Sequence, residues 1–386
     1  MQSDPELQRV VDRLAALLGM PLTLEDADQQ LIVYSAHEDL IDDMRRSSIL
    51  RRATSRATID YFDEWGLRDR HAPFLVPGSE DRGVLPRVCL PLRRDGQLVG
   101  LVWGLLSHEF DALPEMPDPA DLLSELVRVL SRTFEENALG SELLLGLLSP
   151  LQEQRDAAAE RIAERPGLGA GQRFVVIVCE SDRWDHPSVR RSFWNTPLTR
   201  PGVGQIKALR PDRGVALIAG AGGDPVDSAL LGSALTTVRR AADGAATLLA
   251  VGSVVLRAAD ACRSFDDAVR TARAGRALGQ EGVIGWAGLG ALRFLTRLDA
   301  DELRDSIDPR FSALLEDAPQ VAEALGRYLD AAGRVKQVAD EMHIHRATLH
   351  QRLERLADFD IDLRSGRDRL AMHTSLIALR LLGEHA

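Results

Sequence analysis

Residues 335–356 read VKQVADEMHIHRATLHQRLERL, and two short helical patterns meet in this stretch around the turn HIH at 343–345. Val338 and Met342 give the first helix an apolar face, and Ala339 is small enough to let a second helix cross it closely. Two short helices joined by a tight turn are the frame of a helix-turn-helix. The stretch therefore predicts a helix-turn-helix module.

The turn and the second helix fit this frame. Ile344 is an apolar residue between two histidines, and we expect His343 to adopt the left-handed conformation, which histidine tolerates better than most side chains. At about 100° per residue, the second helix has one inward stripe. This stripe consists of Leu349, Leu353 and Leu356.

The remaining side chains of the second helix point outward and are candidates for contact with double-stranded DNA. Arg346 and Arg352 can bond guanine edges or phosphates, and Thr348 can bond a phosphate. An outward Ala347 can touch a thymine methyl, and an outward Gln351 can pair with adenine. The full set of candidate DNA-binding residues is Lys336, His345, Arg346, Ala347, Thr348, His350, Gln351, Arg352 and Arg355.

Two other interpretations explain parts of the same stretch. A helical hairpin with a solvated arginine face has the same spacing, because helix-turn-helix patterns are loose. A metal site is disfavoured because His343, His345 and His350 do not fall on one side of the element and no cysteine lies nearby. We therefore expect neither a metal nor a cofactor.

Composition sets the wider frame. The chain has 386 residues with 45% hydrophobic and 27% charged side chains, which predicts two to three globular domains. No apolar run reaches the roughly 18 residues that a membrane helix needs, and residues 1–10 lack the features of a signal peptide. The prediction is a cytoplasmic protein without a membrane partner.

The net charge of −11 is not evenly spread. Residues 327–386 hold ten Arg and Lys against nine Asp and Glu, which leaves 37 basic and 49 acidic side chains for the first 326 residues. A near-neutral C-terminal part can present one basic face to nucleic acid while the front of the chain stays acidic.

The front of the chain is expected to form a small antiparallel sheet with helices on one side. A turn at Asp95-Gly96 between two apolar runs is a strong hairpin signal. The expected elements are a helix at 6–20, strands at 21–26 and 30–35, a polar helical stretch at 38–66, the hairpin at 88–106 and a proline-rich linker at 108–120.

Helical periodicity returns between 120 and about 165, and such a helix either pairs with a copy of itself or packs on its own domain. Residues 174–181, FVVIVCES, then read as a central strand, and alternating strands and helices to about 295 predict an α/β or α+β domain. Glu180 and Asp182 are the one carboxylate pair in this domain that invites a magnesium interpretation, although a solvated strand end explains them better.

The stretch from Gly333 to Leu382 resembles the C-terminal DNA-binding domain of PucR/CdaR-type bacterial transcription regulators, whose core reads H-R-N-T-L-x-Y-R-L-x-R-[IL]. It is also similar to the Fis-type helix-turn-helix, a dimeric fold. Ala347 replaces the usual Asn and Gln351 the usual Tyr, so the resemblance implies a kept frame with a different sequence preference. Partial matches follow at 361–363 and 368–370. The residues that match the core are His345, Arg346, Thr348, Leu349, Arg352, Leu353, Arg355 and Leu356.

The rest of the chain resembles these regulators more weakly. Residues 140–295 are similar to their degenerate GGDEF-like domain, but the hairpin turn reads RPDR at 210–213, so the resemblance implies no cyclase activity. The first 110 residues are similar to the GAF-like sensor domain of the actinobacterial members. The implied fold class is multidomain α+β. Its parts are a GAF-like α/β sensor at 1–112, connecting helices at 113–165, a GGDEF-like α/β domain at 166–298 and an all-α helix-turn-helix domain at 302–386.

The function implied is sequence-specific binding of promoter or operator DNA by a homodimeric transcriptional regulator, with a small-molecule effector or a partner acting on the N-terminal domain. Two alternatives stay open. The middle domain can make the protein a nucleotide-binding or nucleotide-cyclising enzyme, or the chain can be a sensor that acts through protein contacts without binding DNA.

Overall fold

The computed structural model describes residues 5–27, 29–35, 42, 56–67, 69–79, 81, 83–108, 110, 112–169, 171–221 and 225–383. The chain divides into two compact units, Met1–Gly140 and Ser141–Ala386. None of the helices in the described residues is long and apolar enough to cross a membrane.

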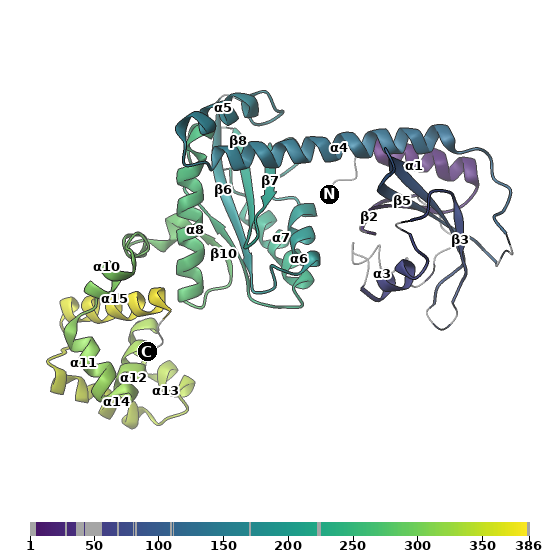
Figure 1. The fold of residues 1–386 in the computed structure, drawn as a ribbon. Coiled ribbons are helices and arrows are strands. Elements are labelled where there is room, and N and C mark those ends of the chain that lie inside the picture. The colour runs from purple at the N-terminus through teal and green to yellow at the C-terminus, as the bar shows by residue number, and fades with distance from the viewer. Residues whose placement is uncertain are drawn as a thin grey trace. The chain divides into compact units, whose positions relative to one another are not determined.

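The first unit is built on a five-stranded antiparallel sheet with the strand order β2-β1-β5-β4-β3 (Figure 1). The predicted hairpin is confirmed, because Asp95 and Gly96 both have the positive φ that a two-residue hairpin turn requires, at 50° and 80°. The elements are α1 (Pro5–Leu18), β1 (Leu22–Asp26), β2 (Leu31–Tyr34), α3 (Arg56–Asp63), β3 (Phe74–Val76), β4 (Arg87–Arg94), β5 (Gln97–Leu105) and the first part of α4 (Ala120–Leu147).

Helices cover both faces of this sheet, so the prediction of helices on one side is wrong. Leu14 of α1 and Leu126 of α4 pack on one face, and Phe62 of α3 packs on the other against Trp103. The reason is that β4 and β5 are buried along most of their length, so each face needs a cover. Of the predicted helical stretch 38–66, residues 38–41 and 43–55 lie outside the described residues.

The second unit contains a mixed sheet with the strand order β10-β9-β6-β8-β7. The strand that was expected at 174–181 is β6, and it lies at the centre between β8 and β9, antiparallel to both. The elements are α5 (Gln152–Ala163), β6 (Gln172–Ser181), α6 (Pro187–Asn195), β7 (Gln205–Leu209), β8 (Gly214–Ala221), α7 (Ser228–Ala241), β9 (Thr247–Val251), η2 (Ala258–Asp260), α8 (Ala261–Ala277), β10 (Gly282–Gly285), η3 (Trp286–Leu289) and α9 (Leu292–Leu295).

A buried lysine closes the C-terminal end of α6, a helix that periodicity did not predict. The ammonium of Lys207 donates to the carbonyl oxygens of Phe193 at 2.9 Å and Trp194 at 3.0 Å, and also to that of Thr196. The last carbonyls of a helix have no partner within it, and a cation is favoured there. Lys207 therefore satisfies main-chain groups that the core would otherwise leave without hydrogen bonds.

Helices alone make up the rest of the described chain, as predicted. The sequence pattern predicted the helices from α12 onward one by one. It predicted α10 and α11 only as part of a helical region, without bounds of their own. The elements are α10 (Ala300–Asp305), α11 (Pro309–Asp317), α12 (Pro319–Asp330), α13 (Val335–Glu341), α14 (Arg346–Glu354), η4 (Arg355–Phe359) and α15 (Gly366–Leu382).

Candidate DNA-binding site

The helix-turn-helix frame consists of α13, the turn at 342–345 and α14. His343 has a φ of 53°, which confirms the predicted left-handed conformation. The N–H of Ile344 donates to the carbonyl of Ala339 at 3.0 Å, so the turn closes directly on α13. This closure fixes the angle at which α14 begins.

Small and apolar side chains hold the two helices together. Val338, Ala339 and Leu349 are buried in one cluster with Ala324 and Ala331, which belong to α12 and its C-cap. The close crossing predicted from the small side chain at 339 is thus present. In the predicted inward stripe, Leu349 and Leu356 are buried and Leu353 is half-buried.

His345 is the N-cap of α14, a role that sequence reasoning did not assign to it. Its Nδ1 accepts a hydrogen bond from the N–H of Ala347 at 3.2 Å, which satisfies one of the free donors at the helix start. The usual N-cap residues are Ser, Thr, Asp and Asn, so composition gave no signal for a histidine. With Nδ1 occupied, Nε2 is the ring atom that can face a ligand.

The second helix does not run as one α-helix to Leu356, as the projection assumed. It changes to the 3₁₀ helix η4 at Arg355. A 3₁₀ helix turns by about 120° per residue, so positions after Glu354 cannot be projected at 100°. Arg355 is therefore the first residue of η4, and the direction of its side chain follows the axis of η4 and not that of α14.

The candidate residues lie on the surface of this frame. Thr348 and Arg352 are half-buried, and the other seven are exposed, namely Lys336, His345, Arg346, Ala347, His350, Gln351 and Arg355. Among the described residues, none of the four cations, Lys336, Arg346, Arg352 and Arg355, has an ion-pair partner. Arg310, Arg327 and Arg380 of the same region do pair with carboxylates, whereas Arg334, Arg364, Arg367 and Arg369 lie outside α13, α14 and η4 and have no ion pair among the described residues.

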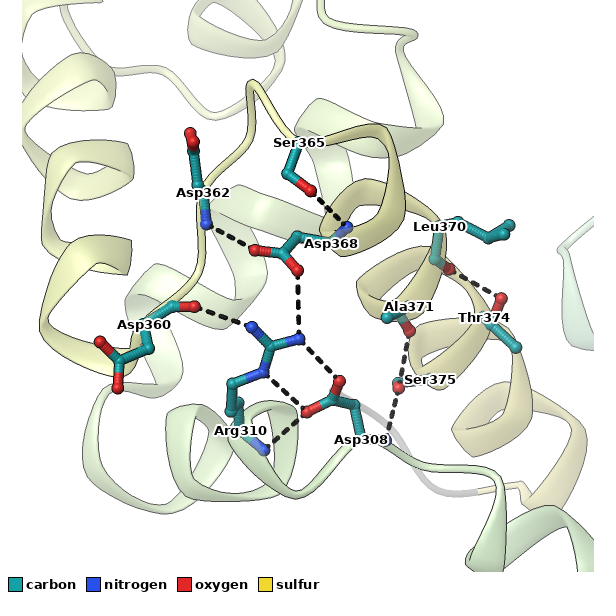
Figure 2. Close-up of polar contacts among 10 residues, drawn as sticks. All are labelled: Asp308, Arg310, Asp360, Asp362, Ser365, Asp368, Leu370, Ala371, Thr374 and Ser375. Carbon is teal, nitrogen blue, oxygen red and sulfur yellow. Dashed lines mark hydrogen bonds and ion pairs between the residues drawn. The ribbon is translucent and has the colours of Figure 1, made fainter.

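A polar network behind the frame was missed by sequence reasoning. Arg310 on α11 donates to both carboxylate oxygens of Asp308, to Asp368 of α15 and to the main-chain carbonyl of Asp360 (Figure 2). Asp308-Pro309 is an N-cap followed by proline at the first helical position, a signal that would have located α11. The sequence pattern did not indicate that Arg310 would meet Asp360 and Asp368.

The strand-end carboxylates of the middle domain are held by arginines. Glu180 lies 2.7 Å from Nε of Arg276 and 2.9 Å from Arg213, and Asp182 lies 2.9 Å from Nη1 of Arg276. Two positive charges therefore occupy the place that a magnesium ion would need. Within the described residues, no three His, Cys, Asp or Glu side chains gather as a metal site requires.

The fold and the exposed face of α14 define a DNA-binding protein of the helix-turn-helix class. Comparison with known families agrees, since residues 321–378 match the PucR C-terminal helix-turn-helix domain and residues 152–274 match the GGDEF-like domain. The chain is therefore a DNA-binding transcriptional regulator that carries a PucR-type helix-turn-helix domain behind a GGDEF-like domain.

Two relatives from Bacillus subtilis (strain 168) match almost the whole chain. The DNA-binding transcriptional activator AdeR is 21% identical over 97% of this chain and 95% of its own length. The proline-responsive transcriptional activator PutR is 21% identical over 97% of both chains.

Among solved structures, a regulator of polyketide synthase expression from Bifidobacterium adolescentis is 17% identical over 63% of this chain and 98% of that chain, with a TM-score of 0.27. PelD from Pseudomonas aeruginosa PAO1 is 15% identical over 66% and 84%, with a TM-score of 0.18.

Proposed function

We propose that this regulator reads operator DNA as a homodimer, with α14 in the major groove. The observation that carries the proposal is the group of four cations on α13, α14 and η4 that have no ion-pair partner among the described residues. Phosphates are the natural counterions for such a group, because each contact releases condensed cations from DNA. Two reading helices must also meet successive major grooves about 34 Å apart, which a dimer achieves.

Each side chain has a proposed role. Arg346, in the first turn of α14, reads a base edge, since the N-terminal residues of a recognition helix enter the groove. Ala347 and Gln351 are one turn apart on the exposed side and set the sequence preference. Thr348 and Arg352 bond phosphates or guanine from the flank of the helix. Lys336, His345, His350 and Arg355 contact the DNA backbone.

The N-terminal unit is proposed to receive a small-molecule effector, and α4 with the middle domain to join two copies. A proline-responsive relative supports an effector that is a metabolite. The proposed domain boundaries are 1–112, 113–165, 166–298 and 302–386. The placement of the two sheets, within residues 22–105 and 172–285, and of the helices from residue 300 onward supports these boundaries.

We further propose that the chain is a cytoplasmic protein and not an enzyme. The arginines at Glu180 and Asp182 support the absence of nucleotide chemistry in the middle domain, because the carboxylates that would hold Mg²⁺ are already paired. The turn RPDR at 210–213 offers no carboxylate pair in their place. Incubation of the full chain with GTP and Mg²⁺ should give no turnover.

Binding of the full chain to DNA from its own promoter region tests the reading site. Arg346→Ala should weaken binding by about tenfold or more, since one base contact is worth about 1–3 kcal/mol. Arg352→Ala should also weaken it. Lys336→Ala should weaken binding to all sequences and lower the salt slope by about one. Arg327→Ala is the matched control, because this exposed arginine pairs with Glu323 on α12.

If neither Arg346→Ala nor Arg352→Ala weakens binding, α14 is not the reading helix. Wild-type protein that shows no binding at any salt concentration would instead favour a sensor that acts through protein contacts.

A further inference from the structure

We propose that Arg310 is a positioning residue for DNA binding, which sets the direction of α14 and η4 by holding the main chain that leaves them. This inference rests on the proposed reading role of α14. Arg310 lies on α11, outside the helix-turn-helix, and it is distinct from the four cations assigned to DNA. Its partners are two carboxylates and one carbonyl, so its charge is already satisfied within the domain.

The first contact ends the helix. Asp360 has a φ of 55° and is the left-handed C-cap of η4. Nη1 of Arg310 donates to its main-chain carbonyl at 2.8 Å. Figure 2 shows the carboxylate of Asp360 turned away from the guanidinium, so the contact depends on the backbone and not on the side chain at this position.

The second contact holds the chain two residues later. The N–H of Asp362 donates to Oδ2 of Asp368 at 3.0 Å, while Oδ1 of the same carboxylate lies 3.3 Å from Nη2 of Arg310. Main-chain groups on both sides of Ile361 are therefore tied to one arginine–aspartate pair. Ile361 itself is 4% exposed and packs in the core of the domain, which fixes the chain at a third point.

The remaining bonds fix the guanidinium. Asp308 accepts from Nε at 3.1 Å and from Nη2 at 2.9 Å, and its own N–H donates to the hydroxyl of Ser375 on α15 at 2.8 Å. Arginine has a planar fork of donors that suits this arrangement, whereas the ammonium of lysine is a single point charge. A lysine at position 310 has one nitrogen for Asp308, Asp360 and Asp368, in place of the three nitrogens that Arg310 uses.

This clamp reaches the DNA-binding residues through a continuous helix. α14 and η4 run without a break from Arg346 to Phe359, and Arg355 is the first residue of η4. A tilt of η4 therefore moves Arg352 and Arg355 relative to the groove. Leu349 would still anchor α14 to α13, so loss of the clamp should misplace the reading helix without unfolding the domain.

Arg310→Ala and Arg310→Lys in the full chain test the inference. The dissociation constant, the fraction of protein able to bind and the salt slope are measured on promoter DNA, well below the unfolding temperature of each variant. We expect Arg310→Ala to raise the dissociation constant about tenfold with the binding fraction and the salt slope unchanged, and Arg310→Lys to restore only part of it. Asp360→Asn keeps the carbonyl and should bind like the wild type, as should Arg327→Ala.

Three results would overturn the inference. Unchanged affinity in Arg310→Ala means that the clamp does not direct the helix. A salt slope lowered by about one means that Arg310 touches a phosphate itself. A reduced binding fraction with an unchanged dissociation constant means that the residue only stabilises the fold. The proposed function fails separately: if Arg346→Ala also binds normally, α14 is not the reading helix, whereas weak binding by Arg346→Ala alone leaves that function standing.

Discussion

Two carboxylates, Glu25 in the N-terminal sheet and Asp330 at the end of α12, have pKa values shifted in opposite directions. Burial raises the pKa of Glu25 to about 8, and the hydrogen bond from Nε1 of Trp103, at 2.9 Å, offsets only part of this. Loss of water also raises the pKa of Asp330, but hydrogen bonds from His373 and Arg380 outweigh it and lower the value to about 2.

The difference shows that burial and partners together decide the pKa of a carboxylate, since Glu25 is buried, whereas the side chain of Asp330 is 39% exposed and bonds to His373 and Arg380. The positive charge of Arg87 lowers the pKa of Glu25, yet that guanidinium is bonded to Asp42 and only partly compensates for burial. Asp330 instead receives two bonds from Arg380, at 3.2 and 2.6 Å, across the gap between α12 and α15. Ionised Glu25 destabilises the first unit, whereas Asp330 links α12 to α15.

Glu25→Gln should have the largest effect, because it removes a carboxylate whose ionisation is disfavoured by burial in the first unit. A carboxyl whose folded pKa is raised stabilises the fold below its unfolded pKa of about 4.3, and this stabilisation is lost as the pH rises through 8. Glutamine has no such dependence and can still accept from Trp103. At pH 8 we expect the variant to gain at most about 5 kcal/mol in free energy of unfolding, and this gain should shrink toward zero near pH 4.

Hydrogen exchange at the amides of β1 and β5 as a function of pH measures this gain within the first unit. Trp103→Phe is the matched control, since it removes the donor and should destabilise the same strands. A Glu25→Gln protein that is less stable than the wild type at pH 8 would show that the carboxylate is charged and well paired.

Lys207→Met tests a buried cation in the same way, and it should have the next largest effect on the free energy of unfolding. The carbonyls of Phe193, Trp194 and Thr196 would lose their donor, while methionine fills a similar volume. Buried acceptors left without partners cost about 1–3 kcal/mol, so we expect a loss of roughly 3 kcal/mol. Calorimetry of the full chain would show it, and an unchanged transition would mean that water replaces the ammonium.

Asp330→Asn should remove the link between α12 and α15. Because the folded pKa of Asp330 is lowered, its stabilisation is present above an unfolded pKa of about 3.9 and is lost as the pH falls toward 2. The side chain is 39% exposed, so solvent screening limits the loss to about 1 kcal/mol at neutral pH. Unfolding of both proteins should converge at pH 2, and a difference that persists there would contradict the role of the charge.

The sequence predicted the helices, strands and turns better than it predicted which side chains meet across the fold. Strand β6 and the Asp95-Gly96 hairpin follow from local signals, and the left-handed turn at His343 follows from what that residue type tolerates. The frame of α13 and α14 was predictable for the same reason: a small residue at Ala339 and an apolar stripe through Leu349 are local patterns.

Long-range partners left no such pattern. Arg310 meets Asp368 across 58 residues, and nothing in the periodicity of either helix indicates that they meet. The chain has two lysines beside 45 arginines, and only the structure separates the buried Lys207 from the exposed Lys336. The 3₁₀ helix that begins at Arg355 ends at the left-handed Asp360, whose carbonyl is held by Arg310 from 50 residues away, and no local pattern indicates that contact.

The smallest expected effect tests whether Arg380 or His373 is the principal partner of Asp330. His373 offers one contact at 3.4 Å from its Nε2, which is longer than either bond from Arg380. His373→Gln should therefore cost a few tenths of a kcal/mol, while Arg380→Ala should cost about as much as Asp330→Asn, near 1 kcal/mol. In a double-mutant cycle with Asp330→Asn, the coupling to Arg380 should exceed the coupling to His373. Equal couplings would mean that the imidazole carries a full share of the link, and α15 would then be tied to α12 by two contacts of similar strength.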